Sequence, residues 1–426
     1  MSQKSFTYYK WITFVSMYSG YFLYILDRKA FAFCMPAIMQ QLSFGENELG
    51  LLASSQNIAY TISKFIGGIL ADRYSCRWLF AFGLFLNGFI IVMFTAFENI
   101  YVLTLIMFVN GLAQGFGWPA AAKMLKNWFS PTELGTWWSI LSSSMNIACS
   151  VGPIVATYLI GIYGWKSFFY IIGVFSVLLT LSTKFSLFDK PQDFGYKPIV
   201  KDQTTKQGRG SFKDLLTNRL MWIVGFCYMN IFLIRTAVLD WGQLFFIQDK
   251  KQSALVASSY VSSLEIGGFF GSIVAGYATD KAVSAYGKST KFGSTRMIAT
   301  LIGWIGTITF LHLTVFLVNK DSSQLLIWTL GLLLGAAVYC PINSYGVVVI
   351  EASPSHLSGT AHALVGFAAN IGGVMAGLPL SSYAKYYAWT GSFILLEIIG
   401  VITIIICAIA LRNVKYSTVN MKKKDE

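Results

Sequence analysis

Charged side chains are scarce in this sequence, where Asp, Glu, Lys and Arg make up only 12% of the 426 residues. A soluble domain carries roughly twice that fraction, so the composition argues against a soluble globular protein. There are three histidines and six cysteines, and no two cysteines have the CxxC spacing of a zinc or redox motif. We therefore expect no metal site, no disulfide framework and no cofactor.

Motifs for nucleotide-driven or hydrolytic chemistry are also missing. The chain has no Walker A loop, no glycine-rich dinucleotide fingerprint, no HExxH zinc motif and no GxSxG nucleophile elbow. An ATP-driven pump is excluded, and a phosphatase would need a nucleophile with an acid–base partner that the chain does not offer. We expect no enzymatic activity.

Apolar length is what the sequence has in abundance, with 55% hydrophobic residues and a mean hydropathy of +0.59. Apolar stretches of about 20 residues, separated by short polar segments, are typical of transmembrane helices. The predicted fold class is therefore an all-α membrane protein with twelve transmembrane helices. The predicted spans lie near residues 11–37, 50–71, 78–97, 100–122, 134–162, 167–188, 219–247, 254–279, 297–318, 325–349, 358–384 and 389–411.

The residues behind the net charge of +13 are distributed unequally between the two sides of the membrane. If both termini are cytoplasmic, 23 of the 32 Lys and Arg residues lie in cytoplasmic tails and loops, and five lie in the opposite loops. This asymmetry is the positive-inside bias of membrane proteins. The basic charge therefore indicates topology, with the lipid bilayer as the surrounding partner, and it does not indicate nucleic acid.

The two halves of the chain repeat each other. The segment Gly68–Arg73 recurs as Gly276–Lys281 at an offset of 208 residues, and Arg28 and Arg235 have nearly the same offset. At an offset of 224 residues, Gly135, Asn146 and Trp165 recur as Gly359, Asn370 and Trp389. Two six-helix halves in parallel predict two pseudo-symmetric bundles, the architecture of the major facilitator superfamily. The expected parts are a bundle at 1–190, a cytoplasmic linker at 191–215, a second bundle at 216–412 and a cytoplasmic tail at 413–426.

The repeated turns also match the loop motif of that superfamily, which opens Gly-x-x-x-Asp-Arg. We expect Asp72 and Asp280 to pair with a neighbouring helix, and these gating pairs to break and reform as the halves move. A polar turn that merely caps a helix is the competing interpretation. The motif residues are Asp72, Arg73, Asp280 and Lys281. Two GxxxG pairs, Gly111 with Gly115 and Gly331 with Gly335, are interpreted as helix-packing elements.

Four cations, Arg28, Lys29, Lys64 and Arg235, lie inside the predicted spans. A cation at bilayer depth costs at least ~2.5–3.5 kcal/mol, so it marks a substrate path or a buried ion pair. Arginine presents a planar fork of donors that suits a phosphate, and the two arginines lie in different halves. We therefore predict that Arg28 and Arg235 share one anionic ligand. Structural salt bridges are the alternative, and the carboxylates that could form them are Asp27, Asp240 and Glu265.

Further polar and aromatic side chains lie in spans that this fold places around its cavity. Aromatic faces stack on sugar rings, while amide and imidazole groups can donate hydrogen bonds to hydroxyl or phosphate oxygens. Ordinary packing in the core is the alternative for each of them. The predicted substrate-binding residues of this kind are Tyr24, Gln56, Tyr60, Trp118, Trp138, Asn146, His362 and Asn370.

The stretch from Arg28 to Pro36 resembles the first-span signature of the organophosphate:phosphate antiporters, Arg-Lys-x-Phe-x-x-x-Met-Pro. The segments 59–65 and 235–241 resemble the same family. Other segments are similar to the endoplasmic-reticulum members that carry glucose 6-phosphate, namely 110–119, 135–138, 240–243, 252–256 and 359–362. The resemblance implies that Arg28 and Arg235 clamp a phosphoryl group, with Lys29, Tyr60, Lys64 and His362 at the site.

The resemblance also implies a function, namely exchange of cytoplasmic glucose 6-phosphate for luminal inorganic phosphate by alternating access. It implies a location in the reticulum membrane and a functional coupling to a luminal glucose-6-phosphatase. Lys423 and Lys424, near the end of the chain, resemble a dilysine retrieval signal. Two positions depart from the family, since reticulum members have Lys where this chain has Arg235, and bacterial glycerol-phosphate carriers have His where it has Met145. Transport of another phosphate ester, and sugar-phosphate sensing without transport, remain alternatives.

Overall fold

The computed structural model describes residues 5–130, 133–196, 212–287, 289–290, 293–353 and 358–413, and nearly all of them are helical. The first half contains α1 (Phe6–Leu42), α2 (Glu46–Arg73), α3 (Cys76–Phe94), α4 (Ile100–Gln114), α5 (Gly117–Trp128), α6 (Leu134–Tyr163) and α7 (Trp165–Ser186). A short 3-10 helix, η1 (Pro191–Phe194), follows. Lys423 and Lys424 lie outside the described residues.

The second half contains α8 (Phe212–Thr217), α9 (Arg219–Leu244), the π-helical turn η2 (Phe245–Asp249), α10 (Ala254–Tyr286), α11 (Thr295–Leu317), α12 (Gln324–Ala352), α13 (Ser358–Met375) and α14 (Leu378–Asn413). Between α10 and α11, β1 (Ser289–Thr290) and β2 (Gly293–Ser294) form a small antiparallel hairpin. This hairpin is the one departure from helix-only structure among the described elements. It occupies the longer loop of the second half and does not alter the all-α class.

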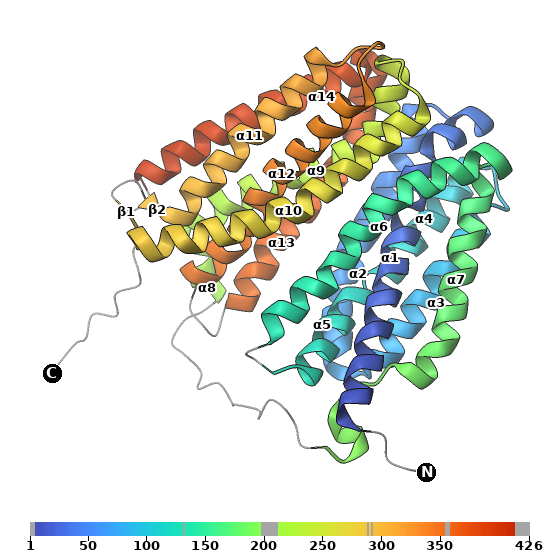
Figure 1. Ribbon diagram of the computed structural model, residues 1–426, viewed down its shortest axis with the longest axis vertical. Helices are drawn as coiled ribbons and strands as arrows, with labels where there is room; N and C mark the ends of the chain where they lie inside the picture. The colour runs from blue at the N-terminus through green and yellow to red at the C-terminus, as the bar shows by residue number, and fades with distance from the viewer. Residues whose placement is uncertain are drawn as a thin grey trace.

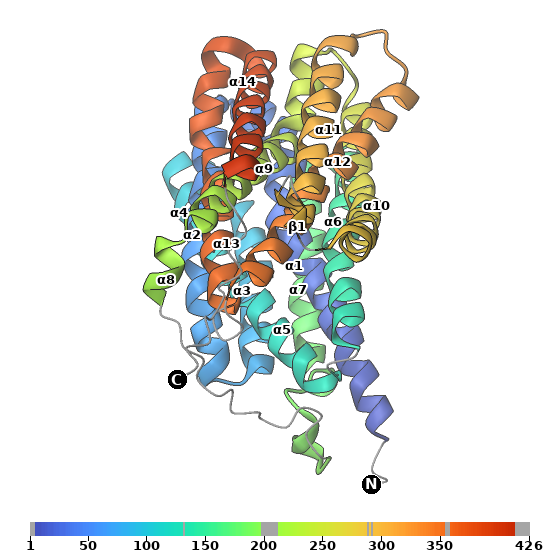
Figure 2. The same cartoon turned by 90° about the vertical axis from the view of Figure 1, so that its left-hand side faces the viewer.

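Two helical bundles make up the molecule, one from α1 to α7 and the other from α9 to α14 (Figure 1). The bundles meet at the end where α1 finishes and diverge toward the end where α1 begins (Figures 1 and 2). We call these ends the distal face and the proximal face. This is the major facilitator fold predicted from the duplicated sequence.

Twelve spans can be counted on this fold. Nine stretches of the described residues are long and apolar enough to cross a membrane, and one of them, Thr360–Ile409, passes a non-helical residue at Ala388. That stretch therefore holds two spans, and α1 and α2 bring the number to twelve. α1 falls short of the apolar criterion because it carries many polar side chains and the charged run Asp27–Lys29.

Backbone conformation repeats at the same offsets as the sequence. Ser43 ends α1 with φ 52°, and Lys251, 208 residues later, has φ 57°. Gly164 separates α6 from α7 with φ 78°, and Ala388, 224 residues later, breaks α14 with φ 56°. A positive φ is unfavourable for non-glycine residues, so its recurrence at equivalent turns is strong support for the duplication.

The GxxxG glycines pack helices together as predicted. A Cβ atom on Gly111 of α4, or on Gly115 directly after it, would overlap the backbone of α2, and one on Gly335 of α12 would overlap that of α10. A Cβ atom on Gly331 would overlap the Ser263 side chain of α10. These contacts need glycine because the helix backbones touch there.

The loop motif is partly described. Asp280 pairs with Arg296 at the start of α11, with Oδ1 2.8 Å from Nη2, so this pair lies within the second bundle. Arg73 and Lys281 are exposed, and the side chain of Asp72 lies outside the described residues.

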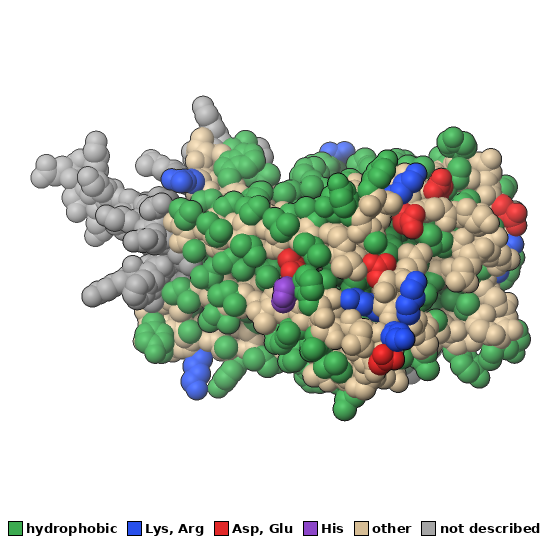
Figure 3. Space-filling model, turned by 90° about the horizontal axis from the view of Figure 1, so that it is seen from above, with side chains coloured by type: hydrophobic (Ala, Val, Ile, Leu, Met, Phe, Trp, Pro, Cys, Tyr) green, Lys and Arg blue, Asp and Glu red, His purple; other side chains and the backbone are tan. Residues whose placement is uncertain are grey.

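The surface carries many apolar side chains. In Figure 3 hydrophobic side chains cover much of the face shown, and most of the charged ones gather toward one end. Such a surface suits a protein surrounded by lipid.

Candidate functional site

A cavity of about 310 Å³ lies between the two bundles. That volume is in the range of small-molecule binding sites. Its walls come from α1, α2, α5 and α6 on one side and from α9, α12 and α13 on the other. The lining residues are Tyr21, Ile25, Arg28, Lys29, Asn57, Tyr60, Thr61, Lys64, Trp118, Ser142, Met145, Cys149, Tyr228, Phe232, Arg235, Thr236, Tyr339, Ile342, Ala369, Asn370 and Gly373.

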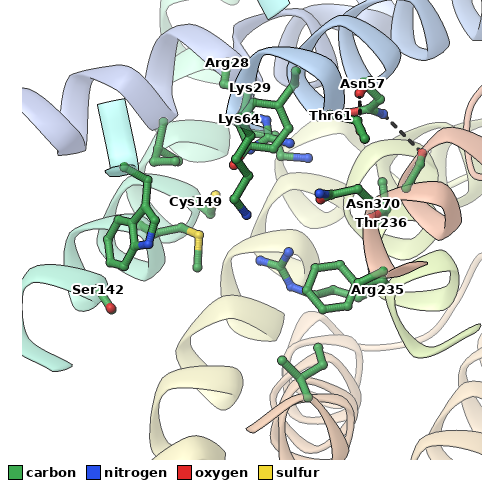
Figure 4. A pocket seen from close by; sticks show the side chains of 18 of the residues that line it. Arg28, Lys29, Asn57, Thr61, Lys64, Ser142, Cys149, Arg235, Thr236 and Asn370 are labelled. Carbon is green, nitrogen blue, oxygen red and sulfur yellow. Dashed lines mark hydrogen bonds between the residues drawn. The ribbon is translucent and has the colours of Figure 1, made fainter. Parts of the chain in front are cut away.

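All four intramembrane cations line this cavity. Figure 4 shows Arg28, Lys29 and Lys64 on one side and Arg235 opposite them, with Cys149 and Asn370 between the two groups. Positive charge thus comes from both bundles to one space. An anion in the cavity could contact both halves at once.

Arg28 and Lys64 share one aromatic ring. The Arg28 guanidinium carbon lies 3.6 Å from the centroid of the Tyr60 ring, and the Lys64 Nζ lies 5.6 Å from it. Cation–π contacts of this kind orient a cation without neutralising it. Within the described part of the chain, neither Arg28 nor Lys64 forms a salt bridge, so both charges remain available to a ligand.

Lys29 points its charge to the other bundle. Its Nζ lies 2.6 Å from Oδ1 of Asp240 on α9, and both side chains are largely buried. A lysine and a carboxylate at this separation form a charge-assisted hydrogen bond. The pair joins α1 to α9 beside the cavity, so it ties the bundles together at the level of the site.

Arg235 is held by a buried carboxylate and a phenol. Its Nη2 lies 2.8 Å from Oε1 of Glu265, and its Nε and Nη2 donate to the Tyr339 hydroxyl at 3.0 and 2.6 Å. The Tyr339 hydroxyl in turn donates to Oε2 of Glu265 at 2.7 Å. Asn146 of α6 donates to the same Oε2 at 3.0 Å, so the cluster also spans both bundles.

The cavity is therefore electropositive. Four cations line it, and two carboxylates, Asp240 and Glu265, pair with two of them. Asp27 does not contribute to the cavity, because its carboxylate accepts a hydrogen bond from Ser176 of α7 inside the first bundle. A dianion such as a phosphate monoester would balance the two remaining charges.

Comparison with known proteins agrees with this arrangement. The profile of the Major Facilitator Superfamily matches residues 17–377. A probable hexose phosphate transport protein of Chlamydia pneumoniae is 31% identical over 421 residues, which covers 92% of this chain and 89% of the relative. The chain belongs to the Major Facilitator Superfamily. Within the superfamily it is a transporter of the organophosphate:phosphate antiporter type, and its relatives and fold are those of transporters rather than enzymes.

Two further similarities bear on this superfamily transporter. The membrane sensor protein UhpC of Escherichia coli (strain K12) is 28% identical over 397 residues, covering 90% of this chain and 88% of the relative. A solved bacterial homolog of the human lysosomal transporter Spinster, inward-facing and unoccupied, has a TM-score of 0.78 at 14% identity. That alignment covers 95% of this chain and 97% of the other, and at such low identity it shows the fold alone.

The structure brings seven of the predicted binding residues to the cavity of the transporter. They are Arg28, Lys29, Tyr60, Lys64, Trp118, Arg235 and Asn370. The other five are not among the lining residues. Tyr24 is buried and donates to the Phe80 carbonyl at 2.8 Å, while Gln56 and Asn146 bond to Arg28 and Glu265 from outside the cavity. Trp138 packs edge-on against Trp118 at 5.1 Å, and His362 lies beside Gly346 of α12.

Several lining residues were not predicted. Asn57 and Thr61 share a helical face with Tyr60 and Lys64, so the three- and four-residue spacing on α2 could have identified them. Tyr339 stands among other apolar residues of its span, with no motif around it, and nothing local in the sequence identifies it. Its role is visible only once α12 is packed against α9 and α10.

The cavity of the transporter is closed on its distal side. Ser54 of α2 donates to the Val374 carbonyl at 3.2 Å and accepts from the Leu378 amide at 2.7 Å. Gly50 and Gly377 lie in the same contact, where an added Cβ atom would overlap Ser381 and Ser54 across the interface. Within the described part of the chain, the hydrogen bonds between the bundles lie at the level of the cavity or on its distal side. Figure 1 shows the bundles diverging proximally, so this is the conformation closed to the distal face.

Proposed function

We propose that this transporter exchanges a hexose phosphate, glucose 6-phosphate in the first instance, for inorganic phosphate by alternating access. The observation that carries the proposal is the position of Arg28 and Lys64, two cations without a carboxylate, opposite Arg235. A phosphoryl group between them would receive charge-assisted hydrogen bonds from both bundles. Trp118 and Tyr21 also line the cavity, with their ring centroids 5.0 Å apart, and they offer apolar faces to a sugar ring.

The same charges explain why the transporter should exchange ligands rather than move empty. Without a ligand, Arg28 and Lys64 of the first bundle carry charge that no carboxylate compensates, and closure of the proximal side would remove both from water at a cost in free energy. A bound dianion compensates this charge, contacts Arg235 on the other bundle, and favours the state in which the bundles close around it. A difference of ~1.4 kcal/mol between states is enough for a tenfold change in population. Both glucose 6-phosphate and inorganic phosphate carry the phosphoryl group that the mechanism requires.

The choice of a hexose phosphate rests on similarity. The Chlamydia relative is described as a probable hexose phosphate transport protein, and the segments 110–119 and 359–362 resemble the glucose 6-phosphate branch of the family. We further propose the branch's setting, the endoplasmic reticulum with cytoplasmic termini, a retrieval signal at Lys423 and Lys424, and a luminal glucose-6-phosphatase that consumes the imported ester. The double variant Lys423→Ala with Lys424→Ala tests the retrieval signal. We expect a fluorescently tagged chain with both changes to move from the reticulum to the cell surface. A tagged chain that stays where it was after both changes contradicts the signal.

Vesicle exchange is the direct test of the function. Purified protein is reconstituted into vesicles loaded with inorganic phosphate, and uptake of labelled glucose 6-phosphate is followed. We expect uptake that requires internal phosphate and that is lost in Arg28→Ala and Arg235→Ala. Arg219→Ala is the matched control, since Arg219 is an exposed arginine at the start of the helix that carries Arg235. Uptake at the wild-type rate in either cavity variant contradicts the clamp.

A second candidate function is sugar-phosphate sensing without transport. The observation that favours it is the sensor protein of Escherichia coli, which is similar over nearly the whole chain. The two functions predict different results in the same preparation. Binding of glucose 6-phosphate in detergent without any exchange in vesicles would support sensing, whereas exchange of phosphate esters supports transport.

A further inference from the structure

The two cavity arginines are held in place by different means. The Arg235 guanidinium has side-chain partners of its own, Glu265 and Tyr339. Arg28 has no such carboxylate in the described part of the chain, and its guanidinium rests on the ring of Tyr60. An arginine side chain has about 2 kcal/mol of rotamer entropy to lose, so an unpaired one needs another means of positioning.

A chain of buried amides supplies a contact to the backbone of Arg28. Gln56 of α2 donates through Nε2 to the Arg28 carbonyl at 3.1 Å and to Oδ1 of Asn110 on α4 at 2.7 Å. Asn110 donates to Oδ1 of Asn87 on α3 at 2.6 Å. Gln114 of α4 donates to both asparagines, at 2.9 Å to Asn110 and 3.2 Å to Asn87. The network thereby links α2, α3 and α4 to the backbone of α1 at Arg28.

The four amides lie within the first bundle, outside the cavity, and none of them is more than 7% exposed. Buried amides are costly unless their hydrogen bonds are made, and a connected network fixes its members more firmly than separate pairs would. Because none of the four lines the cavity, contact with the ligand does not explain their presence. Among the residues that the structure describes, the hydrogen bond that links them toward the cavity is the one from Gln56 to Arg28.

Gln56 and Tyr60 act on Arg28 from the same helix face. They are four residues apart on α2, so they lie one above the other. Gln56 contacts the backbone of Arg28, and Tyr60 contacts its guanidinium. At Gly111, α4 lies so close to α2 that an added Cβ atom would overlap the backbone at Gln56. This contact fixes the position of α2 next to Arg28.

We propose that Gln56, supported by Asn110, Asn87 and Gln114, is a positioning residue for Arg28. The amide network sets the position of the α1 backbone, and Tyr60 then sets the direction of the side chain. In this way the first bundle presents an arginine to the ligand without a carboxylate that would compete for it. The inference rests on the proposed function only in that Arg28 must bind the phosphoryl group.

The test uses Gln56→Met, which keeps the length of the side chain and removes its donor. Inorganic phosphate is the probe, and its apparent affinity is measured from the concentration that half-saturates thermal stabilisation of the purified full-length protein. We expect this affinity to fall about tenfold, because the Arg28 guanidinium is no longer held toward the ligand. The melting temperature without phosphate should change little, because Asn110 keeps its hydrogen bonds to Asn87 and Gln114. In vesicles the KM for glucose 6-phosphate should rise more than the maximal rate falls. Asn230→Leu is the control, because Asn230 is a buried amide of the second bundle whose side chain donates to Thr403 Oγ1 at 2.9 Å, away from the cavity.

The second arm of the test asks whether the effect passes through Arg28. In an Arg28→Lys background, Gln56→Met should have less than half its effect on phosphate affinity, because there is no guanidinium left to position. An unchanged phosphate affinity in Gln56→Met, or a full effect in the Arg28→Lys background, overturns the inference. If Gln56→Met does not fold, Gln56→Asn keeps the amide but is too short to reach the carbonyl, and it should lower the affinity in the same way. A wild-type protein that binds no phosphate would instead overturn the proposed function.

Discussion

Lys29 of α1 and Asp240 of α9 form an ion pair, 2.6 Å from Nζ to Oδ1, that crosses from one bundle to the other beside the cavity. The cations of the site are therefore of two kinds. Lys29 and Arg235 are neutralised by carboxylates, and Arg28 and Lys64 are not. The behaviour of variants should follow this division.

Breaking the pair at one end should destabilise the protein. Lys29→Ala leaves Asp240 buried without its cation, and loss of one partner of a buried pair costs about 3 kcal/mol. The melting temperature of purified protein without ligand should fall, and that of Asp240→Ala should fall by a similar amount. The double variant should be more stable than the sum of the two losses implies. Additive losses would show that the two side chains do not interact in solution.

Glu265→Gln should strengthen anion binding while it weakens the empty protein. The change keeps the size of the side chain and one acceptor oxygen, but the amide nitrogen that replaces the other oxygen cannot accept a hydrogen bond, and the Arg235 charge is left without compensation. The melting temperature without ligand should fall, and the stabilisation by saturating inorganic phosphate should be larger than in wild type. Asn146→Leu, which removes only a neutral donor to Glu265, is the comparison. A smaller phosphate effect in Glu265→Gln than in wild type would contradict the charge argument.

Arg235→Lys tests the position at which this chain differs from the reticulum branch of the family. A lysine ammonium cannot reproduce the planar fork that contacts Glu265 and Tyr339 together. We expect transport to persist, with an apparent affinity for glucose 6-phosphate lowered about tenfold. The ratio of the affinity for the ester to the affinity for inorganic phosphate should also change. Competition by a panel of phosphate esters against labelled phosphate measures that ratio. Identical competition profiles in both proteins would refute a role for Arg235 in selectivity.

Tyr60 should act through its ring. Tyr60→Phe keeps the aromatic face beneath Arg28 and Lys64, whereas Tyr60→Ala removes it. Cation–π contacts contribute about 0.5–2 kcal/mol each, so Ala should weaken phosphate binding by tenfold or more and Phe by clearly less. Isothermal titration with inorganic phosphate separates the two. Equal losses in Phe and Ala would assign the effect to the hydroxyl instead.

The fold was predictable because its signals are repeated and local. Apolar stretches gave the spans, and the recurrence of Gly68–Arg73 at 276–281 gave the duplication, which the backbone confirms at Ser43 and Lys251. The cavity cations were predictable for a related reason, since a charge inside an apolar span is costly and is retained where it binds a ligand or an ion-pair partner. Arg28, Lys29, Lys64 and Arg235 all reach the cavity.

The pairing of these cations was less accessible from the sequence. Asp240 follows Arg235 by five residues, which places it on another face of the same helix, and its partner is Lys29 on a helix 211 positions earlier. The acceptor for Arg235 is Glu265, on a different helix again. Such pairs depend on how helices are rotated and packed against one another. The same applies to Gln56, whose spacing from Tyr60 shows a shared face but not that it reaches a backbone carbonyl.

The contact of Gly50 and Gly377 with the opposite bundle has a practical consequence. Both glycines lie at the closed distal interface, where even a methyl group would overlap Ser381 or Ser54. A bulky residue such as valine at position 50 would therefore be incompatible with the present conformation, while the distally open one would relieve the overlap. Gly50→Val is thus a means of trapping the opposite conformation of the transport cycle for structural study. The lack of side-chain atoms at these two positions therefore allows the bundles to close on the distal side of the site.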